Sequence, residues 1–488
     1  MRTSSTPRSS PSTTWSASSS VCFPGKPVRS GLVQSITLPS SWANFLHDFP
    51  EHAERQVVDA RISAARGVSI IPQQPRSLLR QSFDTTRPEV EIPQPLRALY
   101  QQYRPTPLRR AHGFERWIGT RWRIYYKFEG VNISGSHKLN TALAQAYYYS
   151  KANIKHLVTG TGAGQWGSAI AYACSLFGLE CTVFMVRSSL EQKPARRQMM
   201  ELFGARVFAS PSEQTDVGRD SLAREGEGVG SLGIATGEAL SVARSDPDAR
   251  FAVGSGESCV LLHQTVIGQE AIAQMDALGD FPEVVVACMG AGSNFAGIGM
   301  PFLRASRLRE LPLRLLAVEP CACPKLTRGI YAYDRSDFSG TTPISRMYTL
   351  GGGYIAPPIY AGGLRYHGTS PFLSSLYAAN GFDAIAVDQV TALEAGLAFA
   401  KTEGILPAPE SAHAVAGALE AVRSRPDEPG VILIGISGHG MLDLEAYGRC
   451  MTGALSLGEP DEDALAASLL QLRIYNETAR VALAGGHT

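Results

Sequence analysis

The chain contains few cysteines and no long apolar run, and each shortage excludes a class of protein. Only eight of its 488 residues are cysteines, and no two of them form a CxxC pair. This scatter argues against a disulfide framework and against a zinc site, so no metal ligands are assigned. No apolar stretch approaches the roughly 20 residues that cross a bilayer. The sequence therefore predicts a soluble, cytoplasmic protein with no membrane partner.

An excess of either charge is also missing. Lys and Arg together number 45 and Asp and Glu 44, which leaves a formal net charge of +1. Proteins that bind nucleic acid usually show a basic patch or stripe. We therefore expect no nucleic-acid partner.

Acidic residues are missing from the N-terminal region, where the first is Asp48. Residues 1–34 are rich in Ser, Pro and Arg, a composition that cannot bury a core and predicts a disordered extension without function. Organellar transit peptides are also Ser- and Arg-rich and poor in acid. A plastid location is therefore the alternative to the cytoplasm.

What the chain does have is a regular alternation of strand-like and helix-like segments. Residues 123–128 form a strand-like run, and the apolar runs at residues 156–159, 284–288 and 431–436 are continuous rather than alternating. Such runs suit strands buried on both faces, and helical patterns between them imply parallel pairing. With 44% hydrophobic residues, a chain of this length can form more than one core. The predicted fold class is α/β with layered sheets.

Lys138 stands between one of these runs and a helical pattern at residues 142–148. At the positive end of a helix a lysine is disfavoured and loses its proton more easily. A neutral amine is what a Schiff-base lysine requires. An exposed lysine after a Gly-Ser turn is the alternative interpretation, since most lysines are exposed.

A glycine-rich turn at residues 160–167 follows one strand and precedes a helix. Its Gly162, Gly164 and Gly167 match the dinucleotide-binding spacing, but Arg187 stands where an acid is expected about 20 residues later. An NADP site is therefore poorly supported. The same turn can instead offer backbone N–H groups and the Thr161 hydroxyl to a small carboxylate.

Two further turns follow strands. Residues 290–294 (GAGSN) place successive N–H groups at the start of a helix, which suits a phosphate, although a tight strand-to-helix turn has the same composition. Residues 437–440 (SGHG) place a serine at a strand end. Such a serine is usually a turn residue, and a binding role depends on what it faces.

Taken together, these parts resemble the tryptophan synthase β-chain family of fold-type II pyridoxal-phosphate enzymes, and most closely its longer second class. The resemblance covers about residues 38–450. The similar stretches occur in family order at residues 104–108 (RPTPL), 135–138 (GSHK), 161–167 (TGAGQWG), 261–270 (LLHQTVIGQE), 290–294 (GAGSN), 317–320 (AVEP), 361–368 (AGGLRYHG), 404–413 (GILPAPESAH) and 437–440 (SGHG).

The resemblance implies pyridoxal 5′-phosphate as cofactor, with Lys138 forming its aldimine and moving the α-proton. Ser437 would meet the pyridine nitrogen, and a neutral partner there favours loss of a β-substituent over transamination. The implied cofactor-binding residues are His137, Lys138, Asn140, Gly290, Ala291, Gly292, Ser293, Asn294, Glu410 and Ser437. The implied carboxylate-binding residues are Thr161, Gly162, Ala163, Gly164 and Gln165, and the substrate pocket adds Gly160, Trp166 and Arg365.

The resemblance also implies two domains, each a mostly parallel sheet with helices on both faces. Residues 35–103 and 137–255 would form the N-terminal domain, including a mobile lid of about residues 140–210. Residues 104–136 and 256–450 would form the C-terminal, cofactor-binding domain, followed by a helix and tail at 451–488. A homodimer that needs no α subunit is expected, and a monovalent cation on backbone carbonyls is compatible with the family.

One departure from the family concerns Gly160, which stands where the family has an acidic residue that protonates the departing serine hydroxyl. General acid–base assistance is worth about 10²–10⁴-fold. We therefore expect β-replacement on serine or a related amino acid through an aminoacrylate, giving tryptophan or a tryptophan-like product, with altered substrate scope. Glycine would also leave space beside the β-carbon, and Gly160→Glu would raise activity with serine and indole.

Other functions stay open from the sequence. A fold-type II lyase or dehydratase, or β-substitution with a non-indole nucleophile in specialised metabolism, would also explain the missing acid. A non-catalytic cofactor-binding partner or scaffold is disfavoured by the intact Lys138 and Ser437.

Overall fold

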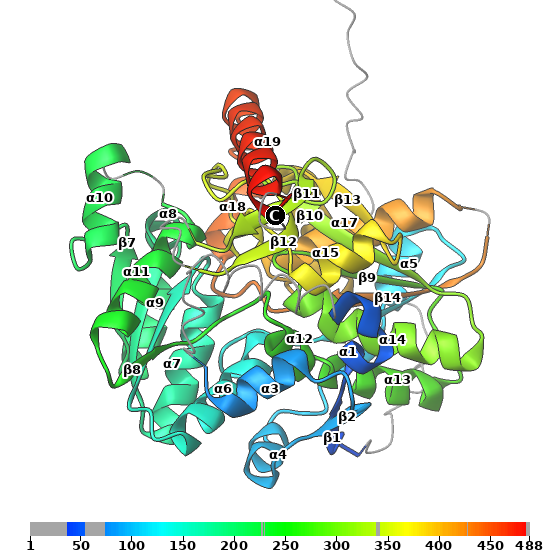
Figure 1. Cartoon of the computed structure of the whole chain (residues 1–488). Coiled ribbons are helices and arrows are strands. Elements are labelled where there is room, and N and C mark those ends of the chain that lie inside the picture. Colours follow the sequence, from blue (N-terminus) through cyan, green and yellow to red (C-terminus); the bar gives the residue numbers. More distant parts are fainter. Residues whose placement is uncertain are drawn as a thin grey trace, which may run out of the picture.

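A computed structural model describes residues 37–53, 74–225, 228, 230–337, 342–426 and 428–484. The extension expected at residues 1–34 lies outside the described residues. Figure 1 shows two sheets, each with helices packed over it, lying side by side. The predicted α/β class with mostly parallel sheets is confirmed.

The N-terminal elements precede the first of the predicted strands. They are β1 (Ser41–Ala43), α1 (Phe45–Asp48), α3 (Arg76–Phe83), β2 (Glu89–Glu91), α4 (Gln94–Tyr100), β3 (Leu108–Arg110) and α5 (His112–Ile118). Strand β4 (Arg123–Phe128) then leads to α6 (Lys138–Lys151). β1 and β2 pair antiparallel as a separate two-stranded sheet.

A four-stranded parallel sheet occupies the middle of the chain, in the order β7-β6-β5-β8. Leu157 and Val183 face α6, α7 and α9, whereas Val158 and Phe184 face α11, so helices cover both faces. The elements are β5 (His156–Thr161), α7 (Gln165–Phe177), β6 (Glu180–Val186), α8 (Arg187–Gln192), α9 (Pro194–Leu202), β7 (Arg206–Ser210), α10 (Asp216–Glu225), α11 (Leu232–Ser245) and β8 (Ala249–Phe251).

A six-stranded sheet in the order β13-β10-β9-β14-β4-β3 forms the larger core, and only its edge pair β3–β4 is antiparallel. Along β9, Val285 and Ala287 pack toward α12 and α14, while Val284 and Val286 pack toward α17, which explains the unbroken apolar run. The elements are α12 (Ser258–Gln264), α13 (Val266–Leu278), β9 (Val284–Cys288), α14 (Ser293–Arg309), β10 (Arg314–Pro320), α15 (Pro371–Ala378), β13 (Asp383–Val387), α16 (Gln389–Glu403), α17 (Pro409–Arg423), β14 (Val431–Ile436) and α18 (Leu444–Met451).

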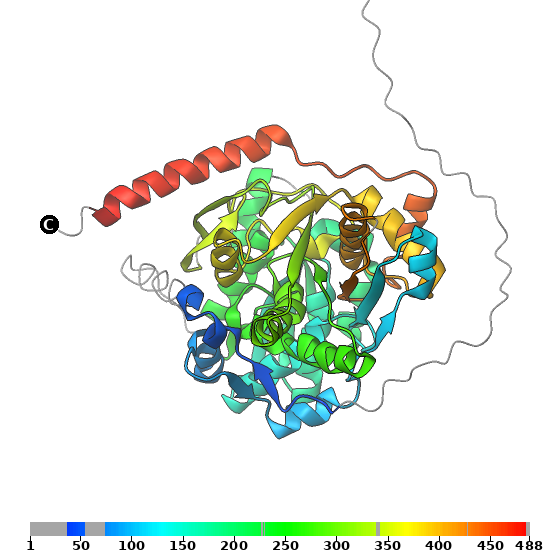
Figure 2. The ribbon, with the colours of Figure 1, turned by 90° about the vertical axis from the view of Figure 1, so that its right-hand side faces the viewer.

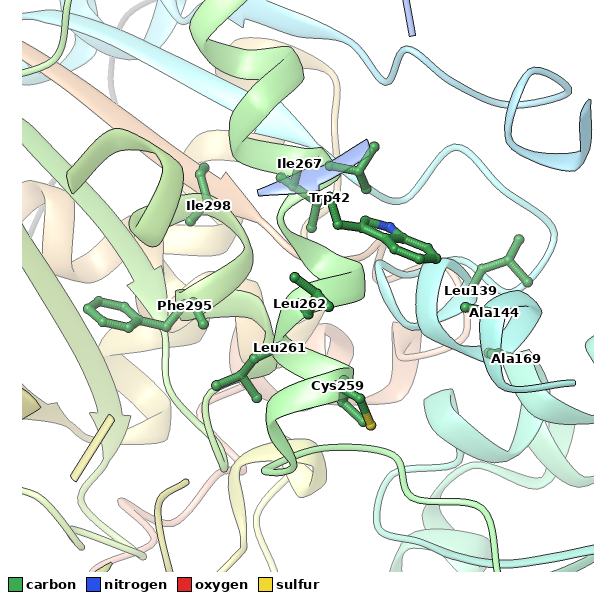
Figure 3. Close-up of a cluster of buried hydrophobic side chains, with 14 of the residues drawn as sticks. Trp42, Leu139, Ala144, Ala169, Cys259, Leu261, Leu262, Ile267, Phe295 and Ile298 are labelled. Atoms are coloured by element: carbon green, nitrogen blue, oxygen red, sulfur yellow. The ribbon is translucent and has the colours of Figure 1, made fainter. Parts of the chain in front are cut away.

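Helix α12 joins the two parts of the molecule. Figure 3 shows its Leu261 and Leu262 packed between Leu139 of α6 on one side and Phe295 of α14 on the other. These side chains are buried in one continuous apolar cluster. Because α12 is clamped by both halves, the loop that precedes it is held in a defined position.

Two elements lie outside the layered core. The antiparallel hairpin of β11 (Ile330–Arg335) and β12 (Ile344–Thr349) was not predicted from the sequence. Helix α19 (Glu462–Ala484) extends along the outside of the body (Figure 2) and is anchored by Ser468, whose hydroxyl donates to the Leu350 carbonyl at 2.7 Å. The sequence predicts a helix at this position. No described helix, α19 included, is long and apolar enough to cross a membrane.

Candidate active site

The site forms where strands of both sheets end. The loop before α6 pairs with the loop after β14: the His137 N–H donates to the Ser437 carbonyl at 2.8 Å, and the His439 N–H donates to the Gly135 carbonyl at 3.0 Å. Parallel strands commonly place ligands at their carboxyl ends. This pairing fixes the start of α6 beside the end of β14.

Lys138 is the first residue of α6 and lines a cavity of about 540 Å³. Burial lowers the pKa of its amine to about 8, while the neighbouring Glu410 and Cys288 act in the opposite direction. The sequence pointed to the helix end as the cause of easy deprotonation, but burial is the larger influence. The neutral fraction near pH 7 is therefore larger than that of an exposed lysine, which suits an amine that joins an aldehyde.

The turn at residues 290–294 caps the long helix α14. Gly292 has φ of 119°, and a side chain at this position would collide with Leu373, so only glycine fits. Its neighbour Ser293 lies 3.1 Å from Nε2 of His137. The helix N-terminus, the Ser293 hydroxyl and this imidazole form a neutral cradle that fits a phosphate.

His137 is held in its neutral form. Burial, followed by the charge of Lys138, lowers the pKa of His137 to about 3. Its Nδ1 lies 3.3 Å from the Ser437 carbonyl, which can only accept, so we assign the proton to Nδ1. Nε2 then accepts from the Ser293 hydroxyl.

Ser437 lies among neutral polar groups. Its hydroxyl is 2.8 Å from that of Ser411 and 3.6 Å from the Cys288 sulfur, and burial raises the pKa of that thiol to about 11. A pyridine nitrogen placed here would meet hydroxyls rather than a carboxylate. Sequence reasoning missed both neighbours, although Ser411 lies within the 404–413 stretch and Cys288 ends the predicted strand.

The turn after β5 is braced against the second sheet. Gly164 adopts φ of 85° at the start of α7, and the Thr161 hydroxyl accepts from the Gly167 N–H at 3.2 Å. The Gln165 amide donates to Glu410 at 3.0 Å, and Glu410 also accepts from the Gly363 N–H at 2.8 Å. Glu410 therefore positions the turn rather than lining the cavity itself.

The cavity brings together a subset of the predicted residues. From the predicted set it is lined by Lys138, Gly160, Thr161, Gly162, Ala163, Gln165, Trp166 and Ala291. Other predicted residues do not line the cavity but contact one another around the phosphate cradle, the turn after β5 and the end of β14. They are Gly290, Gly292, Ser293, Asn294, His137, Glu410 and Ser437. Apolar side chains complete the cavity wall, among them Leu79, Leu232, Leu240 and Phe251.

Two predicted residues lie elsewhere. The side-chain oxygen Oδ1 of Asn140 accepts from Tyr103 and Arg104 at 2.9 Å each, and its side-chain amide nitrogen donates to Gln264 at 2.8 Å. The Asn140 side chain therefore belongs to a buried polar network outside the cavity. Arg365 lines a separate, smaller cavity, where it donates to the Ala356 carbonyl at 2.6 Å. Neither position follows from sequence spacing, because each is set by contacts with distant segments.

Gly160 lines the cavity, but the direction that a side chain would take from it is blocked. A Cβ atom at this position would lie 2.8 Å from the backbone of Ala235 and Thr236 in α11. Real Cβ contacts are longer than this, so α11 occupies the direction that a side chain would take. The structure therefore gives no support to the expectation that glycine leaves room beside the β-carbon, and a gain from Gly160→Glu would require α11 to shift.

Fold and site together define a fold-type II enzyme built for pyridoxal phosphate: the lysine, the phosphate cradle and the neutral ring-nitrogen site all fit that group. A family model described as "Pyridoxal-phosphate dependent enzyme" matches residues 99–438, and the chain belongs to this family. Its relatives are more specific. The chain is 48% identical over 417 residues to "Tryptophan synthase beta chain 2" of Thermotoga maritima, covering 84% of this chain and 97% of that protein.

Further similarities agree with this placement. The chain is 44% identical over 435 residues to "Tryptophan synthase beta chain 2" of Aquifex aeolicus, covering 88% of this chain and all of that protein. Among solved structures, threonine deaminase isoform 2 of Solanum lycopersicum matches with TM-score 0.53 at 16% identity, covering 71% of this chain and 87% of the other. An L-serine ammonia-lyase of Rhizomucor miehei matches with TM-score 0.53 at 15% identity, covering 72% and 98%. These two likenesses show the fold alone.

Proposed function

We propose that the protein catalyses β-replacement on serine or a related β-substituted amino acid, with indole or an indole-like nucleophile, to give tryptophan or a tryptophan-like amino acid. The apolar wall of the cavity carries this proposal. Beside Lys138 and the carboxylate-binding turn, the cavity is lined by Trp166, Leu240 and Phe251. An enzyme that only dehydrates serine has no need of an aromatic-sized apolar compartment, whereas an incoming indole does.

Bound pyridoxal phosphate would supply the electron sink that labilises bonds at the α- and β-carbons. The chain supplies the rest. The turn at residues 161–165 orients the amino-acid carboxylate, and the Lys138 amine takes and returns the α-proton. The neutral surroundings of Ser437 favour loss of the β-substituent.

Residues of the expected lid support exclusion of water. Lys193 donates to the Tyr360 carbonyl at 2.7 Å. Its amine also lies 2.6 Å from the carboxylate of Asp443, which belongs to the loop after β14. Arg196 of α9 lies 3.8 Å from the same carboxylate. These buried ion pairs connect the four-stranded part to the loops of the six-stranded part, and we expect this connection to limit the entry of bulk water during the reaction.

An altered range of leaving groups and nucleophiles could follow from the missing acid at residue 160 for two reasons. The first, extra space for a bulkier nucleophile, is not supported because α11 fills it. The second, weak assistance to the departing hydroxyl, depends on whether another residue gives the proton. Comparing turnover of serine with indole against better leaving groups and larger nucleophiles tests this scope.

The proposed function is tested with purified protein, serine and indole, by following product through mass spectrometry. We expect tryptophan, and a visible absorption band of the bound cofactor that changes when serine is added. Lys138→Ala should remove at least 10³-fold of the activity, in the upper part of the range for a lost acid–base group. Pyruvate without tryptophan would identify a dehydratase and overturn β-replacement.

A further inference from the structure

Glu257 lines the same cavity as Lys138 and Gly160. It follows β8 in a loop pressed between two parts of the site. A Cβ atom at Gly254 would overlap the Trp166 ring, and one at Gly256 would stand 3.6 Å from the Ala291 side chain of the phosphate cradle. The loop is therefore fixed between Trp166, which follows the carboxylate-binding turn, and the phosphate cradle.

The position of Glu257 is rigid, but its carboxyl is uncommitted. The residue is the N-cap of α12, the helix clamped between both halves of the molecule, and its carbonyl accepts from the Val260 N–H at 2.9 Å. Its side chain makes no capping hydrogen bond. No hydrogen bond or ion pair ties the carboxyl to any other described residue.

Glu257 carries the only carboxyl among the described residues that line the cavity. The other ionisable groups there are Lys138, Arg244 and Tyr366. Lys138 is committed to the cofactor, an arginine does not give up its proton, and burial raises the pKa of Tyr366 well above its usual range. The hydroxyls of serine and threonine are weaker acids still.

The surroundings of Glu257 favour the protonated form of its carboxyl. The side chain is partly accessible, as a group facing a cavity must be, yet burial raises its pKa. The positive end of the short helix α12 favours the anion, but burial prevails, and no neighbouring charge contributes to the shift. A carboxylic acid whose pKa is displaced toward the working pH is suited to general acid–base catalysis.

We infer that Glu257 is the catalytic acid for the β-substituent, replacing a group that residue 160 does not carry. This inference rests on the proposed function. As the Cβ–O bond of serine breaks, its electron pair goes to oxygen and the Glu257 carboxyl supplies the proton, so that water leaves and a carboxylate remains. When the nucleophile forms the new bond to the β-carbon, it loses a proton, and the Glu257 carboxylate accepts that proton.

The test compares two leaving groups without any nucleophile. Serine needs a proton to release its hydroxyl, whereas β-chloroalanine releases chloride without one, and both yield pyruvate. In Glu257→Gln we expect turnover of serine to fall by about 10²–10⁴-fold, the range for lost acid assistance. Turnover of β-chloroalanine should stay within about threefold of the wild type, since binding and α-proton transfer are untouched.

Two further variants serve as controls. Glu257→Asp keeps the carboxyl and should recover part of the serine turnover, so its ratio of serine to β-chloroalanine turnover should lie between those of Glu257→Gln and the wild type. Glu213→Gln removes a carboxyl from an exposed position and should match the wild type with both amino acids. A merely structural role for Glu257 would lower both reactions together and leave their ratio unchanged.

A second readout does not depend on turnover. The folded-state pKa of Glu257 is raised above its unfolded value of 4.5, so its ionisation destabilises the folded chain as pH rises. In the full chain with cofactor bound, Glu257→Gln should therefore unfold at a higher urea concentration than the wild type at high pH. The difference should vanish at acidic pH, where both side chains are neutral.

The outcomes separate the two proposals. A wild-type enzyme that forms pyruvate but no tryptophan overturns the proposed function, yet the leaving-group ratio still judges Glu257. A Glu257→Gln enzyme that loses both reactions equally, or neither, overturns the role of Glu257. So does a stability difference from wild type that is the same at every pH.

Discussion

Glu129 and Glu257 are glutamates near Lys138 that differ in their partners. Glu129 accepts from Arg104 at 2.8 and 3.1 Å and from the Thr106 hydroxyl at 2.5 Å. Burial alone would raise its pKa, but the charge and hydrogen bonds of Arg104 lower it to about 2. Burial acts on Glu257 without opposition and raises its pKa.

The difference shows how one residue type takes two roles. Glu129 belongs to a fully buried network in which Arg104 and Lys127 are balanced by Glu129 and Glu270. Through Asn140 this network lies beneath the first turn of α6, which begins at Lys138. A carboxylate with matched cations has a permanent charge and supports the structure, whereas an unmatched carboxyl beside a cavity can exchange a proton.

The largest effect is expected where the matched carboxylate is removed. Glu129→Gln leaves the buried network with an extra positive charge and should destabilise the protein by about 3–5 kcal/mol. Urea unfolding measures this loss. Glu201→Gln is the matched control, because Glu201 pairs with Arg197 at the surface, where such pairs are worth at most about 1 kcal/mol. Equal costs for the two variants would contradict the structural role of Glu129.

The two glutamates should also respond oppositely to pH. Glu129 has a folded pKa of about 2 against an ordinary value of 4.5, so its contribution is complete above pH 4.5 and is lost as pH falls toward 2. Because one pKa unit corresponds to about 1.4 kcal/mol, the lowering from 4.5 to about 2 makes this contribution about 3 kcal/mol. Unfolding of wild type and Glu129→Gln across this range should converge at the acidic end. Parallel curves would show that Glu129 does not titrate there.

The cavity wall can be probed at Gly160. Gly160→Ala places a Cβ against the backbone of α11 and should cost about 1–3 kcal/mol, the usual range for overpacking. Gly160→Glu should cost more and should not raise turnover of serine with indole. Gly353→Ala is the control, because nothing lies within 4 Å of its Cβ position. A stable and more active Gly160→Glu would show that α11 moves aside.

The smallest effect is expected at the ring-nitrogen site. Ser411→Ala removes one hydroxyl from the pair with Ser437 and should weaken cofactor binding by about fivefold, equivalent to about 1 kcal/mol for one neutral hydrogen bond. Titration of the cofactor, followed by its visible absorption, measures the change. Ser245→Ala, at an exposed helix end, should leave it unaltered. An unchanged affinity in Ser411→Ala would remove Ser411 from the site.

Much of the framework could be predicted because its signals are local. Strands β4, β9 and β14 have the predicted bounds. For β9 and β14 the signal is a continuous apolar run between polar turns, which identifies a strand buried on both faces. The start of α6 at Lys138 and the glycine at residue 292 also follow from short patterns.

The remaining features depend on segments far apart in the chain. Ser411 and Cys288 meet Ser437 only because α17, β9 and β14 are neighbours in the fold. Asn140 and Arg365 were expected in the site, but contacts with distant residues place them outside the main cavity. No sequence pattern pointed to Glu257, because its chemistry arises from the burial of a carboxyl without a charged or hydrogen-bonding partner among the described residues.

By itself the amino-acid sequence determined the α/β class, the strand ends that carry the site, the Lys138 position and the membership of the pyridoxal-phosphate family, since these depend on short-range patterns of polarity and backbone geometry. Only the tertiary structure decided which side chains line the cavity, that α11 blocks the side-chain direction at Gly160, and that Glu129 is paired while Glu257 is not. The physical reason is that burial and charge pairing are properties of neighbours in space, and protonation follows those neighbours.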